Sequence, residues 1–556
     1  MQHFHILTRR GFLDRSFKIG MGVALATLAD IPLVVKRALA EGNIGLNGKK
    51  LLFIFLRGAN DGLNSVIPIQ DSGYAINRPT IGIPADSIDY TQPGPCDFVT
   101  TGSNPTFPTT DKAIRLGNGF AALHPSLRFL APVYNAGDLA LMHRVAYPNQ
   151  NRSHFDSQNY WESGAPNNDL VKDGIFYRAM VQSGLANTNA LTGVSIQSAL
   201  PYSLRGSAAA MTNLTDPTRY NLLGVPNSVQ GNFKADNAIR SSDQFPFPDK
   251  LDRNLLNLQY KNLTDTLAIF AGIDFSETGN TFVDNAVTDG DAPYYLFPTQ
   301  NQKNGGAYMN GRTNDSTKYV VDTGAYSLFL NLKAAALILN KTDAIVAGTE
   351  FSGFDPHQTQ ITSSSNRVSG THANLLRRIG WAMYALRQYF TLYGRGSNAP
   401  SSAAKVNWND VVVVTLSEFG RTSVENGSIG TDHAEAGVMF IGGGGVKGYN
   451  KGGPQSGVFG CSTGDSYNGW SLPWVTGTAT SGPSTASMFG ASGRYLKRAF
   501  DYRSVLGKLI RDHLGATQNQ LNQIIAGYAS ESTEHLLNGG TSGVDGVPIF
   551  GEPPIV

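Results

Sequence analysis

The sequence has almost no cysteine: only Cys96 and Cys461 occur among its 556 residues. This scarcity excludes a metal–thiolate cluster and a disulfide framework, because both need more thiols than the chain has. The sequence leaves open whether the two cysteines form one disulfide or stay as separate thiols.

Charged residues are also scarce, at 15% of the chain, whereas apolar residues make up 41%. Six of the 44 basic and two of the 42 acidic residues lie within the first 40 positions, which leaves 38 basic and 40 acidic residues beyond them. Without a basic excess, binding to the phosphate backbone of a nucleic acid has no electrostatic support, so we expect no nucleic-acid partner. The length and apolar content predict a folded protein of three or four domains, or one large α/β domain with insertions.

No apolar run is long enough to form a stable membrane span. The longest near the N-terminus, Ile19–Ala29, has 11 residues and covers about half of the ~30 Å hydrocarbon core of a bilayer. It follows Thr8-Arg9-Arg10-Gly11-Phe12-Leu13 and precedes the small-residue site Ala38-Leu39-Ala40. This order is typical of a twin-arginine export signal. We therefore predict a signal peptide at 1–40, cleavage before Glu41, and a periplasmic or secreted protein.

Several short segments follow the pattern of strands buried on both faces of a sheet. They alternate with segments whose apolar residues recur at helical spacing, which predicts an α/β fold with a mostly parallel sheet and helices on each side. The expected strands are Leu51–Leu56, Leu139–Val145, Asp343–Gly348 and Val411–Leu416. The expected helices are Phe120–Asn135, Tyr326–Leu339, His372–Phe390, Asp501–Leu514 and Gln518–Tyr528.

Two regions differ from this alternation. Residues 185–320 are rich in Asn, Thr, Asp and Gly and contain one helix candidate, Lys250–Phe270, so they predict an insertion or cap beside the sheet. Residues 443–495 are rich in Gly and Ser and predict a long surface excursion. The expected organisation is a signal peptide at 1–40, an α/β domain at 41–534 containing both regions, and a C-terminal tail at 535–556.

Polar residues directly follow the buried strands, where open α/β sheets bind ligands. Asp355 and His357 form one Asp–His pair at such a place, Asp432 and His433 form another, and His154 lies near Asp156. Carboxylate and imidazole together are ligands for zinc, manganese or iron. A single pair would more simply be a turn-capping Asp beside a hydrogen-bonded His. Three pairs favour a metal site. We expect Asp61, Asp355, His357, Asp432 and His433 to converge in one pocket, because each follows a buried strand.

Ser153 has two interpretations. A Ser at a helix start is most often an N-cap whose oxygen accepts backbone N–H groups. It could instead be a nucleophile, with Arg152 holding the attacked anionic group and His154 directed toward the metals or the leaving group. A Ser-His-Asp triad is a poor fit, because adjacent residues do not face each other on a helix and no Gly-x-Ser-x-Gly elbow surrounds Ser153.

Six ordered blocks resemble the exported bacterial family called domain of unknown function 1501, over about residues 48–516. They are Phe55-Leu56-Arg57-Gly58-Ala59-Asn60-Asp61-Gly62-Leu63-Asn64, Arg152-Ser153-His154-Phe155, Phe354-Asp355-Pro356-His357, Ser417-Glu418-Phe419-Gly420-Arg421-Thr422, Gly430-Thr431-Asp432-His433 and Asp501-Tyr502-Arg503-Ser504-Val505-Leu506. That family resembles a branch of the alkaline phosphatase and sulfatase superfamily. The resemblance implies a three-layer α/β/α sandwich and a one-metal or two-metal site that cleaves phosphate or sulfate esters.

The resemblance also implies roles for individual residues. Asp61 would be the metal ligand after the first strand, and Ser153 the nucleophile, with Arg152 and His154 beside it. Asp355 and His357 would hold one divalent ion, such as zinc, manganese or calcium. The other ion would be held by His433 together with Glu418 or Asp432.

Two functions of different classes follow. The first is an exported metal-dependent hydrolase acting on a small-molecule or glycan ester of phosphate or sulfate. The second is a non-catalytic exported binding or assembly protein that keeps the same sandwich without metal-dependent turnover. It is suggested by the departure at Ser417-Glu418, where the superfamily places Asp-His. The sequence does not determine the oligomeric state.

Overall fold

The computed structural model describes residues 44–84, 113–186, 189–217, 265–277, 282–289, 292–298, 325–392, 406–452, 456–462, 466–467, 470–471, 494–529 and 533–556. Residues Asn43–Val556 form one compact unit. The expected signal peptide, Cys96 and most of the two Asn/Gly- and Gly/Ser-rich regions lie outside the described residues.

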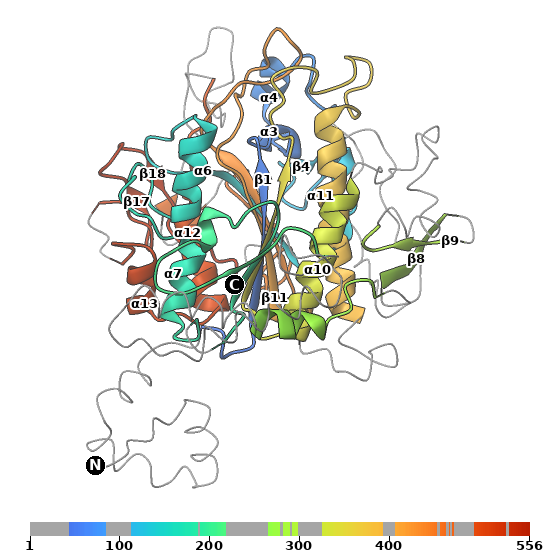
Figure 1. The fold of residues 1–556 in the computed structure, drawn as a ribbon. Helices are drawn as coiled ribbons and strands as arrows, with labels where there is room; N and C mark the ends of the chain where they lie inside the picture. The colour runs from blue at the N-terminus through green and yellow to red at the C-terminus, as the bar shows by residue number, and fades with distance from the viewer. Residues whose placement is uncertain are drawn as a thin grey trace, which may run out of the picture. The chain divides into compact units, whose positions relative to one another are not determined.

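A nine-stranded sheet forms the centre of the molecule, and β1 (Lys50–Arg57) lies in its middle (Figure 1). Parallel neighbours flank β1: β10 (Val346–Ser352) on one side and β11 (Val411–Leu416) on the other. The order continues from β10 to β6 (Gly193–Ile196) and β7 (Thr212–Leu214). From β11 it continues to β12 (Gly437–Gly443), β5 (Leu139–Ala146) and β13 (Val458–Phe459), and β16 (Phe500–Asp501) also pairs with β5.

The sheet is mixed, so the expectation of a mostly parallel sheet was wrong. The strand responsible is β12, which runs antiparallel to both β11 and β5. The chain leaves β11, passes through residues 417–436 and returns directly as β12. An antiparallel neighbour needs only a loop, whereas a parallel neighbour needs a crossover connection, usually a helix. The polar loop after β11 therefore leads back into the sheet.

Helices cover both faces of the sheet because β1 is apolar on both faces (Figure 1). Leu52, Ile54 and Leu56 share one core with residues of α10 (Tyr326–Lys341) and α11 (Thr371–Leu392). Leu51, Phe53 and Phe55 share the other core with α7 (Ile175–Gln182) and α12 (Tyr502–Lys508). Alternate side chains of a strand point to opposite faces, so the unbroken apolar run of β1 supplies both cores.

The expected helix Phe120–Asn135 was wrong in its first half. That half forms β4 (Ala122–Leu123), which pairs with β2 (Val66–Ile67) and β3 (Ile114–Arg115), and then a 3₁₀ turn, Pro125–Leu127. Only α5 (Leu130–Asn135) is α-helical. Pro125 favours an extended residue before it and lacks an N–H donor, so a helix cannot run through this point.

Two segments contribute more to the main body than we expected. Strands β6 and β7 fall within residues 185–320, yet they extend the central sheet. Residues 535–556, expected as a tail, pack on the domain: Phe550 and Ile555 are fully buried, and the backbone N–H of Phe550 donates to the carbonyl of Ala499 at 2.9 Å.

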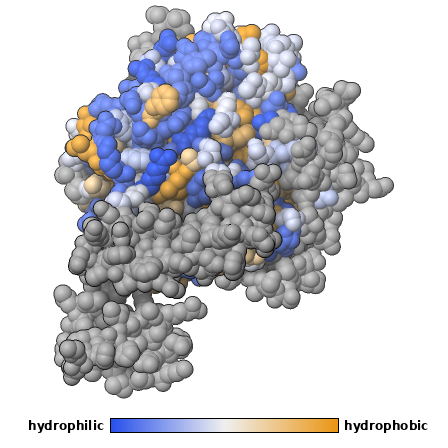
Figure 2. All heavy atoms as spheres, viewed as in Figure 1, coloured by the Kyte–Doolittle hydropathy of each residue, from blue (hydrophilic) through white to orange (hydrophobic). Residues whose placement is uncertain are grey.

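The remaining described elements are short. They are α3 (Gly62–Ser65), α4 (Ser72–Asn77), α6 (His154–Ser163), a 3₁₀ turn (Tyr202–Leu204), β8 (Val283–Asp289), β9 (Ala292–Tyr295), a second 3₁₀ turn (Trp408–Asp410), β14 (Ser466–Tyr467), β15 (Trp470–Ser471), a π-helical turn (Leu509–His513), α13 (Gln518–Ile524), β17 (Gly540–Thr541) and β18 (Pro548–Ile549). Within the described part of the chain, no helix is both long and apolar enough to cross a membrane. On the face seen in Figure 2, the described surface is mostly hydrophilic, and its hydrophobic residues form separate spots.

Candidate functional site

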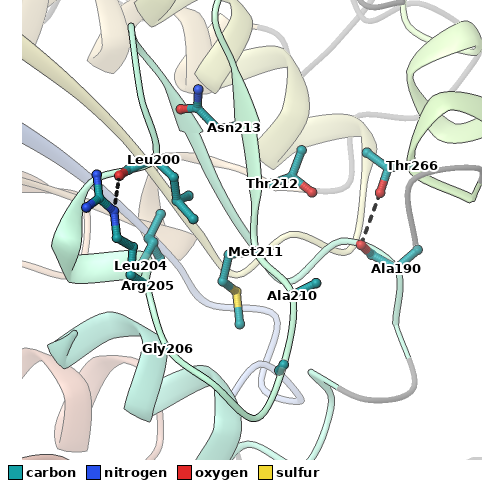
Figure 3. Close-up of a pocket in the computed structure, with 11 residues that line it drawn as sticks. Ala190, Leu200, Leu204, Arg205, Gly206, Ala210, Met211, Thr212, Asn213 and Thr266 are labelled. Carbon is teal, nitrogen blue, oxygen red and sulfur yellow. Dashed lines mark hydrogen bonds between the residues drawn. The ribbon is translucent and has the colours of Figure 1, made fainter. Parts of the chain in front are cut away.

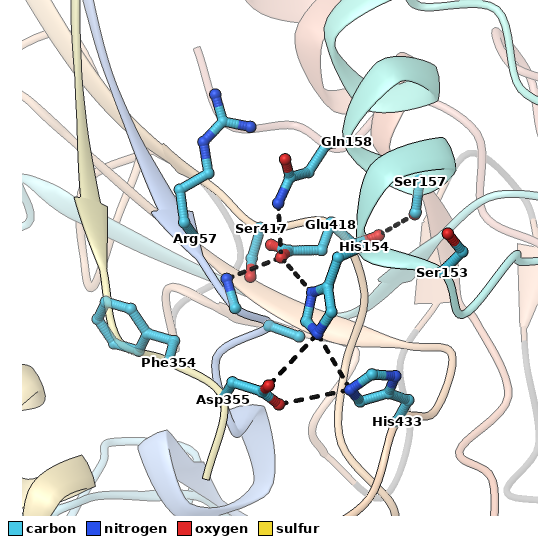
Figure 4. A network of polar contacts seen from close by, with 12 residues as sticks. Arg57, Ser153, His154, Ser157, Gln158, Phe354, Asp355, Ser417, Glu418 and His433 are labelled. Atoms are coloured by element: carbon cyan, nitrogen blue, oxygen red, sulfur yellow. Dashed lines mark hydrogen bonds and ion pairs between the residues drawn. The ribbon is translucent and has the colours of Figure 1, made fainter. Parts of the chain in front are cut away.

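Polar side chains meet where β10 and β11, the two neighbours of β1, end. Asp355 and His357 follow β10, Glu418 follows β11, and His433 lies in the loop between β11 and β12. His154 is the first residue of α6, which lies beside these loops (Figure 4). The two expected Asp–His pairs, Asp355/His357 and Asp432/His433, are in direct contact. His357 contacts Asp355, Asp432 and His433.

Three imidazole rings and one carboxylate form the centre of this cluster. The Nε2 atom of His433 lies 3.1 Å from Nε2 of His154 and 2.9 Å from Nε2 of His357. Asp355 directs Oδ2 to His154 Nε2 at 3.6 Å and Oδ1 to His433 Nε2 at 3.4 Å. Donor atoms of His154, Asp355 and His433 all lie within 4.8 Å of one another. Two ligands of one zinc ion are separated by at most about 4.2 Å, because each bond is about 2.1 Å long, and the three contacts among these residues fall within this limit.

The other ring nitrogen of each histidine already has an acceptor. Nδ1 lies 2.8 Å from Glu418 Oε1 in His154, 2.9 Å from the carbonyl oxygen of Arg152 in His433, and 3.3 Å from Asp432 Oδ1 in His357. A carbonyl or an ionised carboxylate can only accept, so each Nδ1 carries the hydrogen. In the neutral rings the Nε2 lone pairs therefore face one another, which is unfavourable unless a cation lies among them.

The electrostatics of the site favour the neutral form of His433 and the ionised form of Glu418. Burial lowers the pKa of His433, and the nearby Arg421 lowers it further. Burial alone would raise the pKa of Glu418, but its hydrogen bond from His154 and those from Gln158 and the Gly58 amide outweigh this and lower it. Metal ions bind neutral imidazole and ionised carboxylate, so these protonation states suit a divalent ion.

Glu418 is fully buried behind His154. Its Oε1 accepts from the Gly58 N–H at 2.7 Å as well as from His154, whereas Oε2 has no hydrogen-bond partner in the described structure. Ser157 and Gln150 donate to its backbone carbonyl at 2.5 and 3.0 Å. Glu418 thus orients His154 from the far side of the ring, the arrangement in which a carboxylate fixes a metal-ligating histidine.

Arg421 joins the loops that carry the cluster. Its buried guanidinium contacts Asp355 Oδ1 and donates to the carbonyls of Ala59 at 2.9 Å and Thr431 at 3.2 Å. Burial by itself would raise the pKa of Asp355, but Arg421, together with His357 and His154, lowers it. Arg421 therefore holds the loops after β1, β10 and β11 in one arrangement and keeps Asp355 ionised.

Gly58 permits the close approach of two of these loops. Its φ of 108° is unfavourable for other residues, and a Cβ there would lie 2.8 Å from the backbone nitrogen of Asp355. The same residue donates its N–H to Glu418, so one glycine connects the β1 end to both the Asp355 loop and the carboxylate behind His154.

Asp61 does not join the Asp–His pairs as we expected, because its carboxylate lies in a separate buried network. Its Oδ2 accepts from Arg78 Nη1 and from Gln360 Nε2, each at 2.6 Å, and both side chains of the ion pair are fully buried. Burial by itself would raise the pKa of Asp61, but Arg78 and its other partners lower it. Gln360 also accepts from the hydroxyl of Thr431 at 3.2 Å, so Asp61 contacts the His433 loop indirectly.

Ser153 and Arg152 lie at the rim of the cluster. Ser153 occupies the N-cap position of α6, but its hydroxyl makes no capping hydrogen bond, and Figure 4 shows it directed away from Asp355 and His433. Arg152 is exposed, and its guanidinium lies 4.7 Å from the centre of the Tyr495 ring. Only the backbone carbonyl of Arg152 contacts a histidine of the cluster.

The sequence did not single out three residues of this site: Arg421, Gln158 and Gly58. Arg421 and Gly58 both lie in polar blocks that follow strands. Their position after a strand was the one sequence feature that could have identified them. Gln158 is four residues after His154, so one helix face presents both to Glu418.

One cavity of the described residues lies elsewhere. It measures about 540 Å³ and is lined by residues around β7 and the loop before it, among them Arg205, Met211, Thr212 and Asn213 (Figure 3). Neither the His/Asp cluster nor the strands that lead into it, β1, β10 and β11, contribute to its lining, so it is not part of this site.

The fold and site define an α/β protein with a His/Asp cluster at the strand ends of a mixed sheet. A family model described as "Protein of unknown function (DUF1501)" matches residues 403–458, which span β11, the Glu418–His433 loop and β12, and this match supports the DUF1501 family. No curated protein and no solved structure matches the chain.

Proposed function

We propose that the cluster binds a divalent transition metal and that the protein is a metal-dependent hydrolase of phosphate or sulfate esters on an alkaline-phosphatase-like sandwich. The observation that carries the proposal is the convergence of three histidine Nε2 atoms. The Nδ1 atom of each of these rings already has a hydrogen-bond acceptor. His154, Asp355 and His433 supply the first three ligands, and His357 is a further donor beside them. Two imidazoles and one carboxylate favour zinc, manganese or iron over calcium, which prefers oxygen ligands.

Three protein ligands leave a position for substrate, as in catalytic rather than structural zinc sites. A divalent ion held there would polarise an ester oxygen and lower the pKa of water. Glu418 and Asp432 would keep the His154 and His357 rings oriented, and Arg421 would keep Asp355 ionised. Arg152, exposed at the rim, is placed to interact with an anionic substrate group.

The geometry favours water over Ser153 as the attacking group, because the Ser153 hydroxyl is directed away from the cluster. We expect Ser153→Ala to keep hydrolysis of an aryl phosphate or sulfate within about threefold, since attack by water needs no side-chain nucleophile. Complete loss of turnover with unchanged metal content would instead assign the attack to Ser153.

Metal analysis of the purified full chain tests the metal site. Wild-type protein should retain a first-row transition metal after dialysis, and His433→Ala and His154→Ala should lose it together with ester hydrolysis. Asp156→Asn, an exposed change two residues after His154 on α6, is the matched control and should leave both unchanged. Protein without bound metal, or with activity that survives metal removal, would contradict the proposal.

A non-catalytic binding protein is the second candidate, and the Arg421–Asp355 contact favours it because the guanidinium competes with a metal for the carboxylate. This candidate predicts a folded protein that hydrolyses no phosphate or sulfate ester, even with the metal added.

We also propose that residues 1–40 direct twin-arginine export to the periplasm or beyond, supported by the Arg9-Arg10 motif and the short apolar run after it. Arg9→Lys with Arg10→Lys should leave the precursor in the cytoplasm. An exported wild-type protein whose N-terminal sequence begins at Met1 would contradict cleavage at this site.

A further inference from the structure

A second, polar cavity lies beside the cluster at the same edge of the sheet. It measures about 350 Å³, within the size range of small-molecule sites. Its walls come from the ends of β6 and β10 and from helices α10 and α11. They include Gln197, Ser198, Asn331, Glu350, Ser352 and Arg378.

The cavity is connected to the cluster through two adjacent residues of the β1 end. Arg57 reaches the cavity wall, where its Nε lies 3.0 Å from Glu350, while the N–H of the next residue, Gly58, donates to Glu418. On β10, Ser352 precedes Asp355 by three residues, so their Cα atoms are at most about 11 Å apart. A ligand with one end at Asp355 can therefore place its other end in this cavity.

The lining is suited to a neutral polyhydroxylated ligand. Amides, hydroxyls and a carboxylate provide both donors and acceptors, the combination that complements hydroxyl groups, whereas an anion needs donors only. Charges balance, because two cations, Arg57 and Arg378, stand beside two acids, Glu162 and Glu350. Arg57 pairs with both acids, with Glu162 at 2.7 Å. No excess charge is left to select an ion.

Two polar groups of the cavity have no hydrogen-bond partner within the described protein. Oε1 of Gln197 is one, although Gln197 is only 6% exposed. The side chain of Asn331, half-buried on α10, makes no described hydrogen bond either. Buried or half-buried groups without partners are what a hydrogen-bonding ligand satisfies.

We propose that this cavity binds the alcohol portion of the ester, and that this portion is a sugar or another polyol. The inference rests on the proposed hydrolase function, which sets the orientation of the substrate. The phosphate or sulfate lies at the cluster, and the hydroxyl-bearing part lies in the cavity. The cavity walls, rather than the cluster, then set the substrate class.

Kinetics with two matched esters test this proposal. Metal-loaded full-length protein is assayed with glucose 6-phosphate and phenyl phosphate, and with the corresponding sulfates. Asn331→Leu should lower kcat/KM for the sugar ester about tenfold, since one hydrogen bond to a substrate hydroxyl is lost, and change the aryl ester less than twofold. Asn159→Leu, the same change at an exposed position of α6, is the control and should change neither.

Binding of free glucose, measured by calorimetry on wild type and Asn331→Leu, separates this inference from the proposed function. Glucose binding that the substitution weakens, without hydrolysis of any ester, would support the polyol site and contradict the hydrolase. Hydrolysis of both esters with equal losses in Asn331→Leu, or no glucose binding by an active enzyme, would overturn the polyol site and leave the hydrolase standing.

Discussion

Each histidine of the cluster uses one ring nitrogen to fix the direction of the other. Glu418, the Arg152 carbonyl and Asp432 take the three Nδ1–H groups, so Nε2 of each ring points inward. In the proposed site, Glu418 and Asp432, which the sequence suggested as metal ligands, act from behind the rings, and His154, suggested as a catalytic group, is a ligand. Such supporting carboxylates raise the basicity of the histidine that binds the metal.

Glu418→Gln tests the supporting role at the residue scale. The amide oxygen can still accept from His154, but the negative charge is lost, so zinc affinity should fall about 10- to 100-fold. Competition with a chromogenic chelator measures this. Glu425→Gln is the matched control, because Glu425 lies in the same loop but accepts from the backbone N–H groups of Thr80 and Ile81. Equal affinities for wild type and Glu418→Gln would show that Glu418 does not support a ligand.

At the scale of elements, the site depends on how closely the loops after β1 and β10 approach each other. Both strands are parallel and in register from Leu51 opposite Val346 to Arg57 opposite Ser352, so they end at the same edge. The backbone at Gly58, just after β1, then crosses the Asp355 loop with no side chain between the two backbones. Arg421 contacts both the loop after β1 and the loop after β10. The carboxylate position therefore depends on a backbone contact that has no room for a Cβ.

Gly58→Ala should destabilise the protein by about 1–3 kcal/mol and displace Asp355, since both the positive φ and the 2.8 Å approach become unfavourable. Denaturant unfolding measures the first effect and metal affinity the second. Gly48→Ala separates the two causes: Gly48 also has a positive φ, 74°, but a Cβ there would have nothing within 4 Å of it. If both variants bind metal as wild type does, the close approach does not position Asp355.

The whole molecule buries several histidines in their neutral form. Nε2 of His143 lies 3.0 Å from the carbonyl of Val66, and its Nδ1 accepts from the Arg144 N–H. Nε2 of His513 lies 2.8 Å from the carbonyl of Lys50, which ties the C-terminal helices to the start of β1. Burial lowers the pKa of His143 to about 3 and that of His513 to about 4.

These lowered pKa values predict that acid destabilises the fold. Between pH 6.5 and about 4 the unfolded chain binds a proton at position 513 while the folded protein does not, so the free energy of unfolding falls as the pH falls. The contribution of His513 reaches at most about 3 kcal/mol. His513→Gln should therefore flatten the pH dependence of urea unfolding over this range. An unchanged slope relative to wild type, with pH 8 as the common reference, would contradict this.

The sequence by itself determined the buried strands β1, β5 and β11 and where polar residues follow them, but not β6 or β12. The runs at Leu51–Leu56 and Val411–Leu416 are buried at every position, and burial on both faces requires a nearly continuous apolar composition wherever the strand lies in the sheet. The Asp–His pairs could be located for the same reason, because ligand sites gather at strand ends.

Only the tertiary structure decided which groups meet and by which atoms. Asp61 and Asp355 both follow strands of the sheet, yet one contacts Arg78 and the other the histidines, and Glu418 lies behind a ring and not in front of it. The tertiary structure also decided that β12 runs antiparallel to β11. Apolar periodicity reports how deeply a residue is buried, whereas strand direction, side-chain rotamers and through-space partners depend on the packing of segments far apart in the chain.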